Sequence, residues 1–178
     1  TSRGGNVEGH QNTGRYLDMF RMMAKNYEKM ALDCLVTLGG NGTHAAAGIL
    51  AEHGLNIIGL PKTIDNDIYG TEVTFGFQSA VDIATDVIDR VHTTAMSHSR
   101  VMIIELMGNT AGWLTLNAGI AGGADVILIP EIPYAIGSVA DAIYERYEGG
   151  KPYSIIAVAE GASSVTDEPG VSLKGKHY

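Results

Sequence analysis

Apolar positions follow two different patterns along the chain. In some segments they recur every three to four residues with polar residues between them, which predicts amphipathic helices. Between these segments lie short continuous apolar runs bounded by Gly or Pro, which predict buried strands. The expected helices span residues 14–30, 45–53, 75–93, 113–120 and 136–147. The expected strands span residues 35–38, 56–60, 101–106, 126–129 and 154–159.

The order of these segments predicts the fold class. Strands without polar alternation are expected to be covered on both faces, and helices between them indicate parallel pairing. We therefore expect an α/β fold, a mainly parallel sheet flanked by helices in a Rossmann-like three-layer arrangement. In helix 75–93 one face is expected to carry Ala80, Ile83, Ala84, Val87 and Val91. Ligands of such sheets bind beyond the carboxyl ends of the strands.

Composition narrows the class of protein. The 178 residues are 45% hydrophobic with a net charge of -8, which favours a globular fold and argues against nucleic-acid binding. No run of 18 apolar residues predicts a membrane span. The single cysteine, Cys34, lies in an apolar run and is expected to be a buried reduced thiol, which fits a cytoplasmic location. Because the chain opens without Met and closes on an aperiodic stretch, we expect it to be part of a longer protein.

A glycine-rich loop, Gly39-Gly40-Asn41-Gly42-Thr43, joins the first expected strand to a helix. Glycines allow close approach of the backbone to a phosphate, and the start of a helix favours an anion. The loop lacks the spacing and the Lys of a Walker motif. A tight turn with Thr43 as the helix N-cap explains the same residues equally well.

A second polar loop, Pro61-Lys62-Thr63-Ile64-Asp65-Asn66-Asp67, follows the next expected strand. Two carboxylates at this spacing can divide the work of accepting a proton and holding a metal. A solvated turn also explains Asn66 and Asp67, but it does not explain the cation and the hydroxyl of Lys62 and Thr63.

Polar groups also follow two later strands. Met107-Gly108-Asn109 comes after strand 101–106, and Glu160 follows strand 154–159, where substrate contacts are usual in this architecture. Arg100, at the start of strand 101–106, is either a phosphate clamp or a surface cation.

These loops, in this order, resemble those of the phosphofructokinase family. The segment 61–67 matches the family signature P-[GK]-T-I-D-N-D, and segment 39–43 resembles the donor loop G-G-D-G-[ST]. Further similarity follows in order through Ser97-His98-Ser99-Arg100, Met107-Gly108 and Pro130-Glu131-Ile132.

The resemblance implies a glycolytic kinase, a transferase that phosphorylates the 1-hydroxyl of fructose 6-phosphate with Mg²⁺ as cofactor. Asp65 would be the general base, and Arg3 would steady the transferring phosphoryl group. Thr63 and Asp67 would position the substrate and the metal, with Asn41 as a second metal ligand. The residues implied to bind the donor are Gly40, Asn41, Gly42, Thr43 and Lys62. The residues implied to bind the sugar are Met107, Gly108, Asn109 and Glu160. Arg100 would reach the 6-phosphate in a neighbouring subunit, so the resemblance implies a homo-oligomer with shared active sites.

Two residues depart from the family pattern. Asn41 replaces the usual magnesium-binding Asp, and Asn109 replaces the usual Arg after Met-Gly. Gly42 favours ATP as the donor, because pyrophosphate-using members carry an Asp there. A pyrophosphate-dependent phosphotransferase and a non-catalytic regulatory subunit of the same fold stay open as alternatives.

The resemblance also implies that the two halves of the chain bind different substrates. Residues 1–95 would form a donor-binding part with the catalytic loop 61–67, and residues 96–178 would form a sugar-phosphate-binding part. The family's N-terminal nucleotide loop and its C-terminal clamp of the 6-phosphate are missing from this sequence. We therefore expect the isolated chain to be inactive.

Overall fold

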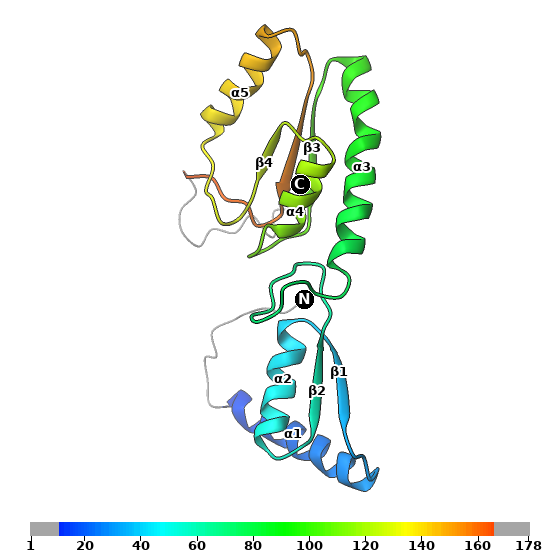
Figure 1. The fold of residues 1–178 in the computed structure, drawn as a ribbon. Helices are drawn as coiled ribbons and strands as arrows, with labels where there is room; N and C mark the ends of the chain where they lie inside the picture. The colour runs from blue at the N-terminus through cyan, green and yellow to red at the C-terminus, as the bar shows by residue number, and fades with distance from the viewer. Residues whose placement is uncertain (1–10, 166–178) are drawn as a thin grey trace. The chain divides into compact units, whose positions relative to one another are not determined.

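The computed structural model describes residues 11–165, which form two compact units (Figure 1). Unit 1 contains residues 11–63 and 68–71, and unit 2 contains residues 64–67 and 72–165. The long helix after the second polar loop belongs to unit 2. The structural division therefore falls near residues 63–72, whereas the division at residue 95 concerns where donor and sugar bind and stays a prediction.

Unit 1 is a small parallel sheet with a helix on one face. Its elements are α1 (Gln11–Lys29), β1 (Leu35–Gly39), α2 (Asn41–Glu52) and β2 (Ile57–Pro61). β1 and β2 pair in parallel, with Leu35 opposite Ile57. α2 packs against both strands and buries Ala47 and Leu50 (Figure 1).

Unit 2 is built around a three-stranded parallel sheet. Its elements are α3 (Phe77–His98), β3 (Val101–Leu106), α4 (Trp113–Ala121), β4 (Val126–Leu128), α5 (Ile136–Glu148) and β5 (Ser154–Ala159). The strand order is β3-β5-β4, so β5 is the central strand. α3 packs on α4, β3 and β5, and α4 packs on β4 and β5 (Figure 1). The core joins α3 residues such as Ile88 to Leu114 of α4 and Ile155 of β5.

The parallel α/β class and the element order are confirmed, but the coverage of the strands is not as predicted. Only β5 is buried along nearly its whole length among the described strands, whereas alternate residues of β1 and β3 are exposed. Val36, Leu38 and Ile58 lie on one face of the unit 1 sheet and are about half exposed or more. A continuous apolar run therefore did not guarantee two covered faces, because α2 covers only one face of this sheet.

Two predictions about single side chains are also wrong. Of the five residues expected on one face of α3, Ala84 is buried and Ala80 and Val91 pack against the core, but Ile83 and Val87 are exposed. Ile83 and Val87 were misassigned because apolar residues extend beyond the face that meets the sheet, and the periodicity does not give the limits of that face. Cys34 is a free thiol but is only partly buried.

A polar cluster joins α5 to the amino ends of β4 and β5. The Asp125 carboxylate forms an ion pair with Arg146 at 2.6 Å and accepts a hydrogen bond from the Ile155 N–H at 2.9 Å. Arg146 also donates through Nε to the hydroxyl of the buried Ser154 at 3.1 Å. Every partner in this cluster is hydrogen-bonded, which is the condition under which buried charge is tolerated.

Across residues 11–165, no helix is both long enough and apolar enough to cross a bilayer.

Candidate active site

The glycine-rich loop of unit 1 is the first turn of a helix. α2 begins at Asn41 with Gly40 as its N-cap, so the alternative in which Thr43 caps the helix is wrong. The first bond of the helix runs from the His44 N–H to the Gly40 carbonyl at 3.0 Å. The N–H groups of Asn41, Gly42 and Thr43 precede this bond, in the turn where a helix attracts anions.

Three glycines of this loop differ in the space around them. A Cβ at Gly39 would collide with the Thr43 side chain, so this position needs glycine for close approach. A Cβ at Gly40 would lie 3.7 Å from the Cβ of Thr63, an ordinary contact. A Cβ at Gly42 would meet no atom within 4 Å. The space beside Gly42 is therefore open to a ligand.

Strand pairing brings the start of the second polar loop to the glycine-rich loop. Gly39 and Pro61 are opposite each other at the ends of β1 and β2, and the Lys62 N–H donates to the Gly39 carbonyl at 2.9 Å. Together with the proximity of Thr63 to Gly40, this places Lys62 and Thr63 beside the predicted donor loop within unit 1.

The acidic part of the second loop belongs to unit 2 and is held by Asn66. Asn66 adopts a left-handed conformation with φ 53°. Its amide donates to the Glu72 carbonyl at 3.2 Å, and its Oδ1 accepts from the N–H of the buried Thr74 at 2.9 Å. Ile64 packs against the core of the unit. Asp65, between these two fixed residues, is partly buried, as is Asp67.

The role of Asn66 as an anchor is not among the predictions from sequence. A solvated turn was one explanation of the residue, whereas both ends of its side chain bond to backbone groups six to eight residues further along the chain. The available signal was the residue type, since Asn is enriched among non-glycine residues at positive φ. Asn66 therefore positions the two carboxylates on either side of it.

Unit 2 also brings together the two polar loops that follow β3 and β5. The Glu160 N–H donates to the Leu106 carbonyl at 2.9 Å, and the Gly161 N–H donates to the Gly108 carbonyl at 3.0 Å. Gly108 has φ 144°, a conformation available essentially to glycine alone. The segment Met107-Gly108-Asn109 and Glu160 therefore lie side by side at the carboxyl edge of the sheet.

Arg100 is separated from these loops by the length of β3. It precedes the strand, whereas Met107 follows it, and six residues of strand at about 3.3 Å each span roughly 20 Å. Within one unit 2, Arg100 therefore lies at the opposite edge of the sheet from the residues predicted to bind the sugar. The prediction for Arg3 falls outside the described residues.

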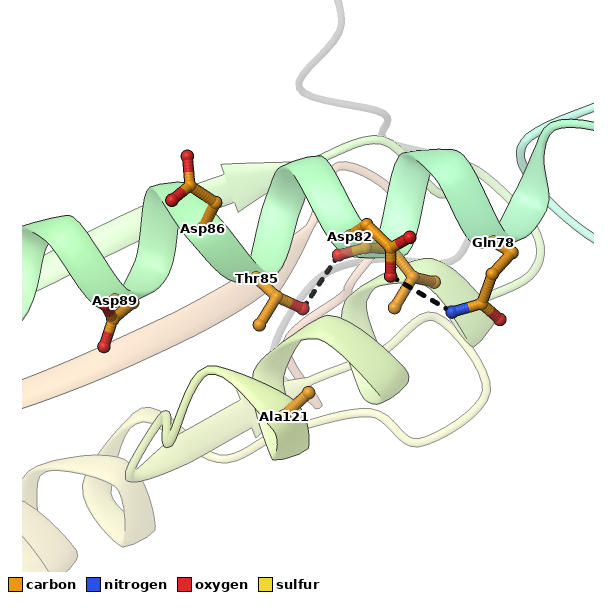
Figure 2. A pocket seen from close by; sticks show the side chains of 7 residues that line it. Gln78, Asp82, Thr85, Asp86, Asp89 and Ala121 are labelled. Carbon is orange, nitrogen blue, oxygen red and sulfur yellow. Dashed lines mark hydrogen bonds between the residues drawn. The ribbon is translucent and has the colours of Figure 1, made fainter.

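A separate hollow lies between α3 and α4 (Figure 2). Asp82, Asp86 and Asp89 of α3 and Ala121 of α4 line it, although the Asp86 side chain points away from α4 (Figure 2). Two of its hydrogen bonds are local to α3, from Gln78 to Asp82 and from Thr85 to the Val81 carbonyl. Three carboxylates repel phosphates, so this hollow does not suit an anionic substrate.

The donor atoms for a metal are few. In the part of the chain that the structure describes, no group of three or more His, Cys, Asp and Glu side chains could hold a metal ion. Mg²⁺ is usually held by one or two carboxylates together with substrate phosphates and water. A carboxylate such as Asp67 and an amide oxygen such as Asn41 are oxygen donors of the type that Mg²⁺ binds, although Asn41 adds no charge.

The sequence of the chain is similar to those of known proteins. The sequence model described as Phosphofructokinase matches residues 1–176. The ATP-dependent 6-phosphofructokinase of Spirochaeta thermophila is 64% identical over 140 residues, covering 79% of this chain and 38% of that protein. The ATP-dependent 6-phosphofructokinase 3 of Bacteroides thetaiotaomicron is 57% identical over 145 residues, covering 82% of this chain and 43% of that protein. The chain therefore spans less than half the length of these curated relatives.

Solved structures agree with this assignment. Phosphofructokinase from Saccharomyces cerevisiae superposes with a TM-score of 0.72 at 34% identity, over 84% of this chain and 24% of that one. The pyrophosphate-dependent enzyme of Marinobacter aquaeolei superposes with a TM-score of 0.71 at 24% identity, over 82% of this chain and 41% of that one, which shows the shared fold. The chain belongs to the phosphofructokinase family.

Proposed function

We propose that this chain is the catalytic segment of an ATP-dependent 6-phosphofructokinase. The observation that carries the proposal is the signature loop 61–67, whose first half lies beside the glycine-rich turn in unit 1 and whose acidic half is anchored through Asn66 in unit 2. The names of the relatives at 64% and 57% identity support the same reaction and the same donor.

In the proposed reaction, Asp65 accepts the proton of the sugar 1-hydroxyl as that oxygen bonds to the terminal phosphorus of ATP. The bond from this phosphorus to the bridging oxygen breaks, and ADP leaves. Thr63 and Asp67 position the sugar and the metal, and the first turn of α2 holds the donor phosphates through backbone N–H groups. Asp67 and Asn41 are the residues that would supply oxygen ligands to Mg²⁺, which would provide positive charge against the phosphates. Catalysis of this kind depends on positioning and electrostatics.

Two observations support ATP rather than pyrophosphate. Gly42 places no side chain in the open space beside it, where pyrophosphate-using members carry an Asp, and the relatives at 64% and 57% identity are named ATP-dependent. We further propose a cytoplasmic homo-oligomer in which Arg100 serves the sugar site of a neighbouring subunit. The position of Arg100, one strand length from the sugar loop of its own unit, supports that arrangement.

The decisive experiment places this chain in a complete enzyme. In a chimera, the chain replaces the matching segment of the Spirochaeta thermophila protein, and turnover of fructose 6-phosphate is measured with ATP and with pyrophosphate separately. We expect activity with ATP. Asp65→Asn should lower kcat by about 10²–10⁴-fold, the usual contribution of a general base.

A matched control distinguishes loss of the base from loss of a negative charge. Asp89→Asn removes one exposed carboxylate of α3 and should leave kcat within about twofold, since surface substitutions are usually mild. Retention of turnover within a few-fold in Asp65→Asn would favour the regulatory-subunit alternative. Faster turnover with pyrophosphate than with ATP would contradict the proposed donor.

A further inference from the structure

The loops at the carboxyl edge of unit 2 are connected in a closed ring. The loops after β3 and β5 are joined by the bond from the Gly161 N–H to the Gly108 carbonyl at 3.0 Å. The loops after β4 and β5 are joined by Tyr134, whose N–H donates to Ser163 at 3.0 Å and whose carbonyl accepts from Val165 at 2.9 Å. The hydrogen bonds named in both connections join backbone groups.

The third connection of the ring depends on a side chain. Glu131, in the loop after β4, accepts a hydrogen bond through Oε1 from the Gly112 N–H at 2.8 Å. Gly112 ends the loop after β3 and is the N-cap of α4. Glu131 therefore connects the β4 loop to the segment that starts with Met107-Gly108-Asn109.

The glycine at position 112 supports this assignment independently. Its φ of -92° is available to any residue, so its backbone conformation does not require glycine. A Cβ there would instead lie 2.5 Å from the Cβ of Ile129 and 2.7 Å from Oε2 of Glu131. The absence of a side chain at 112 therefore leaves room both for Ile129 and for the carboxylate that reaches the backbone.

The position of the carboxylate also has an electrostatic reason. Glu131 places a negative charge at the N-terminus of α4, where the helix dipole and the first-turn N–H groups favour an anion. The protein itself thus supplies an anion for this helix end.

We propose that Glu131 is a positioning residue for the sugar-binding loop, acting through Gly112. This inference rests on the proposed function, in which Met107, Gly108 and Asn109 contact fructose 6-phosphate. Glu131 fixes the end of that loop relative to α4, so its loss weakens sugar binding without touching the phosphoryl donor or the base.

The kinetic experiment uses the active chimera described above. Glu131→Ala should raise KM for fructose 6-phosphate by about 5–10-fold, the loss expected for one charge-assisted hydrogen bond at a partly exposed site. KM for ATP and kcat should stay within about twofold. Glu131→Gln keeps an acceptor oxygen and should restore most of the affinity. Asp141→Ala, which removes an exposed carboxylate of α5, is the matched control and should change neither parameter.

A reciprocal variant tests the pair. Gly112→Ala crowds both Ile129 and the carboxylate and should raise KM for the sugar by at least a similar factor. Adding Glu131→Ala to it should change KM little further, because interacting residues are not additive. An unchanged sugar KM in Glu131→Ala would overturn the proposal. Equal losses in kcat and in both KM values would also overturn it, because they indicate a general structural defect.

A measurement without substrate keeps this inference separate from the proposed function. Hydrogen exchange of the Gly112 amide, followed by NMR on the 178-residue chain, should accelerate in Glu131→Ala and stay slow in Glu131→Gln. An exchange rate that does not respond to Glu131→Ala overturns the inference even if the chimera phosphorylates the sugar. A chimera that is inactive with both donors refutes the proposed function, while the exchange rates still test the contact.

Discussion

Units 1 and 2 share a parallel sheet but differ in how that sheet is supported. In unit 2, α3 and α4 pack on the sheet, and its central strand β5 is buried almost throughout. Among residues 11–165, the sheet of unit 1 has two strands, and its face carrying Val36, Leu38 and Ile58 is exposed. Sheets of two strands have little stability of their own. We infer that the predicted sugar-binding loops rest on a firmer support than the predicted donor loop.

The largest expected difference in stability between the two units comes from truncating one apolar side chain in each. Ile88 is fully buried in the unit 2 core, so Ile88→Ala should lower the free energy of unfolding by about 3–5 kcal/mol. Leu38 is 61% exposed on the unit 1 sheet, and Leu38→Ala should change the same quantity by less than about 0.5 kcal/mol. Urea denaturation followed by circular dichroism measures both. A cost at Leu38 equal to that at Ile88 would mean that the open face of unit 1 is covered in solution.

An intermediate effect is expected from the polar cluster of unit 2. Asp125→Ala leaves Arg146 and the Ile155 N–H without their shared acceptor, and should lower the free energy of unfolding by about 2–3 kcal/mol. Asp86→Ala breaks the exposed pair with Arg90 and should cost less than about 1 kcal/mol. Thermal denaturation at low and high salt distinguishes them. Equal costs would show that burial does not strengthen the Asp125 cluster.

The smallest effects compare two glycines within unit 1. A Cβ at Gly59 of β2 would lie 2.7 Å from the His44 ring, so Gly59→Ala should lower the free energy of unfolding by about 1–2 kcal/mol. A Cβ at Gly48 in α2 would meet no atom within 4 Å, so Gly48→Ala should raise the free energy of unfolding by about 0.5–1 kcal/mol. Melting temperatures of the two variants should move in opposite directions. A stable Gly59→Ala variant would mean that the His44 ring can move away at little cost.

Much of this fold is predictable because its signals are local. Strands 101–106 and 154–159 were placed as observed, since each is a dense apolar run with clear boundaries. The start of α2 was misplaced by four residues, because Asn41 and Gly42 are weak helix formers that the surrounding structure recruits into a helix. The limits of the buried face of α3, which leaves out Ile83 and Val87, could not be predicted because they depend on the sheet rather than on the helix.

The residues of the candidate site could be predicted from the sequence, but the hydrogen bonds that hold its loops in place could not. The loop 61–67 is specific enough to be recognised by its residues alone. The anchoring of Asn66 to Thr74 and of Glu131 to Gly112 joins residues that are 8 and 19 positions apart. Such pairs depend on how the loops fold back on each other, which local patterns do not contain.

The start of α2 at Asn41 has a consequence for how donor preference could change. Because the N–H groups predicted to bind the donor phosphates belong to a regular helix, their spacing is fixed by helical geometry and survives substitution of nearby side chains. A single substitution of Gly42, which has no side chain, would then change which donor is accepted while the helix stays intact. Divergence between nucleotide-using and pyrophosphate-using enzymes would require few mutations in such a protein.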